Sequence, residues 1–160
     1  MKLVLLRHAL QESAVTEMKE SPGLSLKGKK QQQSTNQHLL DSGVRLGCVY
    51  SSPVRRAVET AQIVGECFSC PVVIEGSLGN DFREERLMEI LQDSPHDAIC
   101  FIGHAPTLPD FAQLLVGETQ IPDIGRSSAL ILEVEKNEGR LQCRPLQYVT
   151  PEDVVQTFEV

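Results

Sequence analysis

Short, continuous runs of apolar residues recur along the chain and limit the folds open to it. These runs cover residues 2–6, 48–50, 71–74, 98–102 and 129–134. Their hydrophobicity is continuous rather than alternating, which indicates strands that are covered on both faces. Such strands belong to sheets that are mostly parallel and carry helices on either side. We therefore predict a three-layer α/β fold around a doubly wound, mostly parallel sheet with helices on both faces.

Helical signals fill the gaps between these runs. Ser25 is placed to cap a helix that continues to about residue 40 and ends near Gly43. Ser52 followed by Pro53 is typical of a second helix start, because proline at the first helical position loses no hydrogen bond. Two further helices are expected over residues 83–91 and 108–116.

The last third of the sequence predicts a hairpin. A strand is expected over residues 141–146, and Glu138-Gly139 is a turn signal between it and the preceding run. The sheet should therefore have an antiparallel edge strand. The length of 160 residues is enough for one domain with its own core, so we expect a single domain over residues 1–160.

Composition disfavours several classes of function. The formal net charge is −7 and no long run of lysine or arginine occurs, which disfavours a nucleic-acid partner. The apolar run at residues 3–6 is too short for a signal peptide or a membrane span, so we expect a cytoplasmic protein without membrane contact. The five cysteines are irregularly spaced, and Cys67 and Cys70 follow a helix in a manner unlike a redox or zinc motif.

Two of the predicted strands end in a histidine. Arg7 and His8 follow the first apolar run, and Gly103 and His104 follow the fourth. The carboxyl ends of parallel strands meet at one edge of a sheet, where ligands bind, so we expect these side chains to share a crevice. A neutral imidazole is a nucleophile, and an arginine offers a charged, planar donor group to phosphate oxygens.

A third basic group is expected from the helix that follows residues 48–50. The free N–H groups and the positive dipole end of that helix would face the same crevice. Arg55 and Arg56 lie ~100° apart on a helix, so one of them should point inward. Arg55 stands four residues before Glu59 and is placed to pair with it on the solvent-exposed face of the helix. Arg56 is therefore the better candidate for a ligand.

The chain resembles the histidine phosphatase superfamily, which also holds the cofactor-dependent phosphoglycerate mutases. The resemblance rests on Arg7-His8, Leu24-Ser25-x-x-Gly28-x-x-Gln31, Ser52-Pro53-x-x-Arg56-Ala57-x-x-Thr60 and Gly103-His104, in that order along nearly the whole chain. At this short length the chain looks most like the bacterial phosphohistidine phosphatase branch typified by SixA. The resemblance implies that His8 becomes phosphorylated and that Arg7, Arg56 and His104 hold the phosphoryl group.

The sequence departs from the superfamily pattern at two places. Position 9 is alanine, where much of the superfamily has glycine. The mutases and small-ester phosphatases also have a carboxylic acid after the third strand, and Asp81 is a candidate for it here that no spacing fixes. An alkoxide leaving group needs such an acid, which contributes ~10²–10⁴-fold. Phosphohistidine releases imidazole, whose conjugate acid has a pKa of ~6.5, so a site without a strong acid favours phosphohistidine.

Our hypothesis is a phosphatase of phosphohistidine on a phosphorelay or phosphotransfer protein. Arg7, Arg56, His104 and backbone amides near Ala105 would bind the transferring group, and neither a metal ion nor a cofactor would be needed. One alternative is a phosphatase of a small phosphoester with Asp81 as general acid. Another is a catalytically silent module that binds phosphate or phosphohistidine. The sequence does not fix the oligomeric state.

Overall fold

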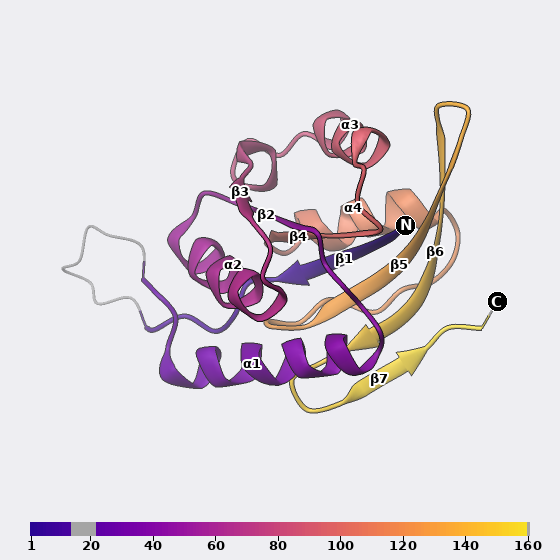
Figure 1. The fold of residues 1–160 in the computed structure, drawn as a ribbon. Helices are drawn as coiled ribbons and strands as arrows, with labels where there is room; N and C mark the ends of the chain where they lie inside the picture. The colour runs from indigo at the N-terminus through magenta and orange to yellow at the C-terminus, as the bar shows by residue number, and fades with distance from the viewer. Residues whose placement is uncertain (14–21, 160) are drawn as a thin grey trace.

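The computed structural model describes residues 1–13 and 22–159, which form one seven-stranded sheet flanked by helices (Figure 1). The strand order is β3-β2-β4-β1-β5-β6-β7. The strands are β1 Lys2–Arg7, β2 Cys48–Ser51, β3 Val72–Ile74, β4 Ala98–Gly103, β5 Ala129–Asn137, β6 Arg140–Val149 and β7 Val154–Thr157. The sequence also predicts a loop over the polar segment 11–23, which lies largely outside the described residues.

One half of the sheet is parallel, as the continuous apolar runs predict. Strand β4 pairs in parallel with both β1 and β2, and β2 pairs in parallel with β3. All six residues of β4 are buried, as are the four central residues of β1. The carboxyl ends of β1, β2 and β4 therefore lie along one edge, with Arg7 opposite Gly103 in the register.

The other half of the sheet is antiparallel. Glu138 and Gly139 have φ values of 49° and 80°, the left-handed conformation that a two-residue hairpin turn requires. They join β5 to β6 in the hairpin that projects at the upper right of Figure 1. The antiparallel part extends beyond the single edge strand expected from sequence, because β5, β6 and β7 pair in succession.

The helices cover both faces of the sheet, so the predicted fold class is confirmed. They are α1 Leu26–Asp41, α2 Arg55–Phe68, α3 Glu84–Asp93 and α4 Thr107–Val116, with a short 3₁₀ helix η1 at Gly76–Leu78. One apolar cluster joins the sheet to α1 and α2 through residues such as Leu6, Leu39 and Ala61. The other joins the opposite face to α3 and α4 through residues such as Leu5. In the part of the chain that the structure describes, no helix is long and apolar enough to cross a membrane.

Helix boundaries follow the predicted signals at α1 and α4 but not at the start of α2. The Ser25 hydroxyl accepts a hydrogen bond from the Gly28 amide as the N-cap of α1. Helix α2 begins at Arg55, two residues later than the Ser52-Pro53 start predicted from sequence. The Ser52 hydroxyl accepts from the Val54 amide at 3.2 Å and so shapes a turn before the helix rather than its first residue.

Gly28 makes a close approach that a larger residue would prevent. A Cβ atom built at Gly28 would lie 2.1 Å from the carbonyl oxygen of Leu10. That carbonyl is held in place, because it accepts hydrogen bonds from the backbone amide and the hydroxyl of Ser25 at 3.0 and 3.2 Å. The glycine therefore lets α1 pack directly on the segment that follows His8.

We expect Gly28→Ala to lower the free energy of unfolding by ~1–3 kcal/mol, because overpacking against fixed backbone outweighs the ~1 kcal/mol by which alanine favours a helix. Urea unfolding followed by circular dichroism measures this change. Gln33→Ala, at an exposed position of the same helix, is the matched control and should change the stability by less than ~0.5 kcal/mol. Equal stability of the two variants would contradict the packing described here.

Candidate active site

Arg7 and His8 lie where the backbone leaves the carboxyl end of β1. The Arg7 amide donates to the carbonyl of Ser128 at 3.2 Å, and the His8 amide donates to the carbonyl of Gly103 at 3.1 Å. The Ser127 amide in turn donates to the carbonyls of Arg7 and His8, at 3.1 and 3.3 Å. The backbone of this corner is therefore held by β4 on one side and by the residues just before β5 on the other.

The ring of His8 is fixed in one orientation and one tautomer. Its Nδ1 lies 2.8 Å from the carbonyl oxygen of Ala9, which can only accept a hydrogen bond, so Nδ1 carries the proton. Its Nε2 accepts a hydrogen bond from Nε of Arg56 at 3.3 Å. The free lone pair of the imidazole is therefore on the nitrogen that faces an arginine.

His8 is neutral at pH 7. Its side chain is buried, and this burial is the main cause that lowers its pKa to about 4. The positive charges of His104, Arg56 and Arg7 lower the pKa further, while the hydrogen bond to Ala9 opposes the shift. A neutral ring with an unprotonated Nε2 is the form that can attack an electrophile.

Arg56 reaches His8 from the first turn of α2, whereas its neighbour points elsewhere. Nε of Arg55 donates to the Glu59 carboxylate at 2.9 Å, the pairing predicted from the sequence. The Thr60 hydroxyl donates to the carbonyl of Arg56 at 2.7 Å and accepts from the Ala9 amide at 3.0 Å. Thr60 thus connects the first turn of α2 to the residue that orients the His8 ring.

The second histidine lies beside the first. The ring centroids of His8 and His104 are 5.1 Å apart, and the two planes are tilted by 52°. Nε2 of His104 is 2.8 Å from the Ser52 hydroxyl. Burial, followed by the charges of Arg56 and Arg7, lowers the pKa of His104. Ala105, which was expected to contribute a backbone amide, is exposed in the turn between β4 and α4.

The guanidinium of Arg7 is surrounded by positive charge. Burial and the charges of Arg126 and Arg56 lower its pKa, in that order, while Tyr148 has the opposite effect. Its Nη1 donates to the carbonyl of Ile124 at 3.4 Å. Within residues 1–13 and 22–159, the buried Nε of Arg7 and the buried Nδ1 of His104 have no hydrogen-bond partner.

This arrangement is suited to a tetrahedral oxyanion. Two arginines and a histidine surround a neutral imidazole, and two buried nitrogens lack partners. Buried polar groups are nearly always paired, so unpaired ones at such a place indicate where ligand atoms bind. Arginine donors aimed at phosphoryl oxygens can stabilise the charge of a transferring phosphoryl group.

The other residues singled out in the sequence take no part in the hydrogen bonds described above. The Asp81 side chain is 79% exposed and pairs with Arg83 at 3.2 Å. Cys67 is exposed and Cys70 half-buried, and both are free thiols. Among the described residues, no group of three or more His, Cys, Asp or Glu side chains is arranged to hold a metal ion.

Sequence reasoning missed the roles of three parts of the site. Ser52 and Thr60 belong to the motif that contains Arg56, so that motif is the signal that could have indicated their contacts. The segment 124–128 carries no comparable signal. Its contribution is made by backbone groups of Ile124 and Ser127, and such groups leave no mark on the sequence. Arg126 of the same segment adds positive charge near Arg7.

Comparisons with known proteins identify the family and the fold of the chain. The model of the histidine phosphatase superfamily, branch 1, matches residues 3–140. The protein histidine phosphatase SixA, solved with tungstate, is similar at a TM-score of 0.80 and 18% identity, over 94% of this chain and 97% of that one. A SixA protein of Agrobacterium tumefaciens is similar at a TM-score of 0.75 and 22% identity, over 94% of this chain and 97% of that one.

A mycobacterial glucosyl-3-phosphoglycerate phosphatase is also similar, at a TM-score of 0.69 and 16% identity over 90% of this chain and 96% of that one. At identities of 16–22%, the likeness to these structures shows a common fold. No curated protein sequence matches the chain significantly.

We expect the His8 ring to titrate with a midpoint near its lowered pKa of about 4 and to keep its proton on Nδ1 at pH 7. Proton–nitrogen NMR spectra of the histidine rings report both properties. The unfolded chain protonates His8 near pH ~6.5. Between the two values the unfolded state binds a proton that folded His8 does not, so this group lowers stability as the pH falls through that window. A midpoint at or above 6.5, or a proton on Nε2, would contradict the geometry.

Proposed function

The chain belongs to branch 1 of the histidine phosphatase superfamily, and we propose that it hydrolyses phosphohistidine on a partner protein through a phosphorylated His8. The observation that carries this proposal is the state of the His8 ring. Nδ1 is committed to the Ala9 carbonyl at 2.8 Å, so the neutral ring presents Nε2 as its nucleophilic atom beside Arg56.

In the first step, the lone pair of His8 Nε2 forms a bond to phosphorus as the phosphorus–nitrogen bond of the substrate breaks. The leaving imidazole takes that electron pair, and the proton it already carries on its other nitrogen leaves it neutral. Arg7, Arg56 and His104 hold the three phosphoryl oxygens. Arginine donors suit this role because the charge of the transition state is spread over those oxygens.

In the second step, a water oxygen forms a bond to phosphorus and the bond to His8 Nε2 breaks. The electron pair of that bond returns to Nε2, and the water proton leaves with inorganic phosphate or to solvent. His8 is then neutral again, with its proton still on Nδ1. No metal ion and no cofactor takes part in either step.

The preference for phosphohistidine rests on the exposure of the candidate general acid. An imidazole leaves without assistance once its ring is protonated, whereas an alkoxide needs a general acid. The Asp81 carboxylate, the sequence candidate for that acid, is exposed and paired with Arg83. This supports phosphohistidine over a small phosphoester. A silent binding module is disfavoured because binding alone requires no free nucleophile.

We expect Arg56→Ala to reduce kcat by about 10²–10³-fold, because it removes a donor to the transferring phosphoryl group. Arg55→Ala is the matched control on the same helix turn, and its activity should stay close to that of the wild type because Arg55 pairs with Glu59. Steady-state release of phosphate from a phosphohistidine protein measures both variants. A large loss in Arg55→Ala with an active Arg56→Ala would show that the wrong arginine has been chosen.

The central experiment compares substrates in the wild type, His8→Ala and Asp81→Asn. A phosphorylated histidine-containing phosphotransfer protein should be dephosphorylated much faster than a panel of alkyl phosphates. His8→Ala should lose turnover and trap no radiolabelled phosphoryl group after acid-free quenching. Asp81→Asn should keep its activity on the phosphohistidine protein.

Each alternative gives a different pattern in that experiment. Faster hydrolysis of an alkyl phosphate, abolished in Asp81→Asn, would assign the site to a small phosphoester. Phosphate or vanadate binding without turnover in the wild type would assign it to a silent module. Full activity in His8→Ala would remove the covalent mechanism.

A further inference from the structure

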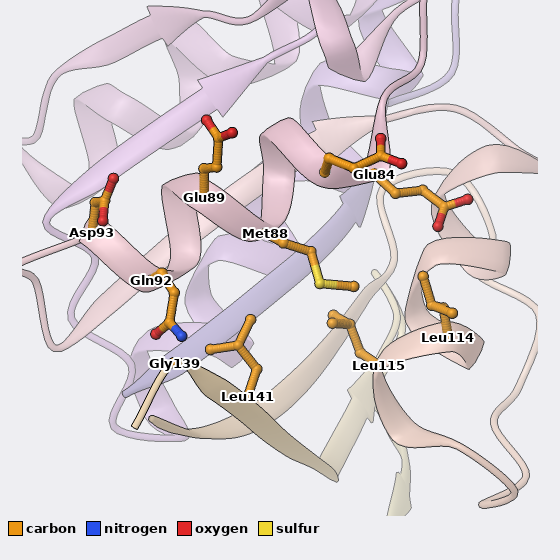
Figure 2. Close-up of a pocket in the computed structure, with 10 residues that line it drawn as sticks. Glu84, Met88, Glu89, Gln92, Asp93, Leu114, Leu115, Gly139 and Leu141 are labelled. Atoms are coloured by element: carbon orange, nitrogen blue, oxygen red, sulfur yellow. The ribbon is translucent and has the colours of Figure 1, made fainter. Parts of the chain in front are cut away.

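A second surface of the molecule is hollowed, away from the histidines. A groove of about 670 Å³ lies between helix α3, helix α4 and the β5–β6 hairpin (Figure 2). Neither histidine of the site and neither Arg7 nor Arg56 lines it. The catalytic proposal therefore does not account for this surface.

The floor of the groove is apolar. Met88 of α3, Leu115 of α4 and Leu141 of β6 are half-buried and point toward a common space in Figure 2. Leu114 borders the same space and is 51% exposed. Apolar side chains from three separate elements thus present one continuous surface to water. Such a surface is typical of an interaction site.

One wall of the groove is acidic. No lysine or arginine lines it. Four carboxylates of α3 do, those of Glu84, Glu85, Glu89 and Asp93. Glu85, Glu89 and Asp93 follow one another at intervals of four residues, so they form a row along one face of the helix with a step of ~6 Å. In Figure 2 the carboxylates of Glu89 and Asp93 point away from the apolar floor, so this row forms the outer rim of the groove.

Two neighbouring cations leave most carboxylates of this wall available to a partner. Arg86 contacts Glu89 at 3.2 Å and Glu75 at 3.5 Å, and it is half-exposed. Nζ of Lys136 donates to the backbone carbonyls of Gln92 and Ser94 at the end of α3, at 3.3 and 2.8 Å. Exposed pairs such as Arg86–Glu89 are weak, and a second cation can compete for the carboxylate.

We propose that this groove binds a basic amphipathic helix of a partner protein. The apolar face of that helix packs on Met88, Leu115 and Leu141, and lysines or arginines spaced four apart meet the carboxylate row of α3. An amphipathic helix fits a groove of this kind through anchors at such spacing. A basic partner fits best, because the groove wall is acidic and the whole chain has a net charge of −7.

The test uses a fluorescent 18-residue peptide of leucine and lysine in a helical amphipathic order. Its binding to the full-length protein is followed by anisotropy at several salt concentrations. The double variant Glu85→Gln, Glu89→Gln should bind about fivefold more weakly and with a shallower salt dependence, because two surface ion pairs are lost. The control variant Glu66→Gln, Glu152→Gln removes the same charge from exposed positions outside the groove and should bind like the wild type.

Two further measurements locate the peptide. Backbone amide shifts in NMR spectra should change most near Gln92 and Gly139. Leu114→Asn should weaken binding while its thermal unfolding stays close to that of the wild type, because the side chain is half-exposed. A leucine and glutamate peptide of the same order should bind much more weakly than the basic peptide.

Several results would overturn the proposal. Equal binding of the basic peptide by the groove variant and the control variant is one, and shifts confined to another surface are a second. Sedimentation showing a dimer that Leu114→Asn dissociates would assign the groove to a second copy of this chain. None of these measurements involves turnover, so their outcome does not depend on the catalytic proposal.

Discussion

The hydrogen bond from Nδ1 of His8 to the carbonyl of Ala9, at 2.8 Å, determines which ring nitrogen faces Arg56. Ala9 is itself held, because its amide donates to the Thr60 hydroxyl, which donates in turn to the carbonyl of Arg56. The turn of α2 that supplies the arginine therefore also orients the imidazole. This explains why the arginine and the threonine occur four residues apart in one motif: a single helix face performs both tasks.

The electrostatics of the site follow from its cluster of positively charged side chains. Burial is the main cause that lowers the pKa of His8, and the charges of His104, Arg56 and Arg7 add to its effect. A bound phosphoryl group would bring the missing negative charge, and nearby negative charge raises the pKa of a histidine. The ring of His104 would then become a better donor when the ligand is present. The positive cluster thus helps to keep His8 neutral, and a bound phosphoryl group would offset its effect on the pKa of His104.

Structure could be predicted from the sequence where a residue has a single structural role. Continuous apolar runs predicted the parallel strands, and Ser25 predicted the start of α1. Strand β7 was missed because its residues Val154–Thr157 are mostly exposed at a sheet edge and form no apolar run. The start of α2 was predicted too early because Ser52 has two roles, toward His104 and toward the Val54 amide. The hydrogen bonds between segment 124–128 and Arg7 could not be predicted, since backbone groups of that segment make them.

The two surfaces of the molecule have opposite charge, and this bears on how a partner protein would be chosen. The site is positive and suits a phosphoryl group, whereas the α3 wall of the groove is negative and suits basic side chains. A partner with a phosphorylated histidine and a separate basic helix would be attracted at both places. A uniformly acidic phosphoprotein would be attracted at the site and repelled at the groove. Because specificity is a difference of affinities, such repulsion discriminates between phosphorylated partners that the site alone would treat alike.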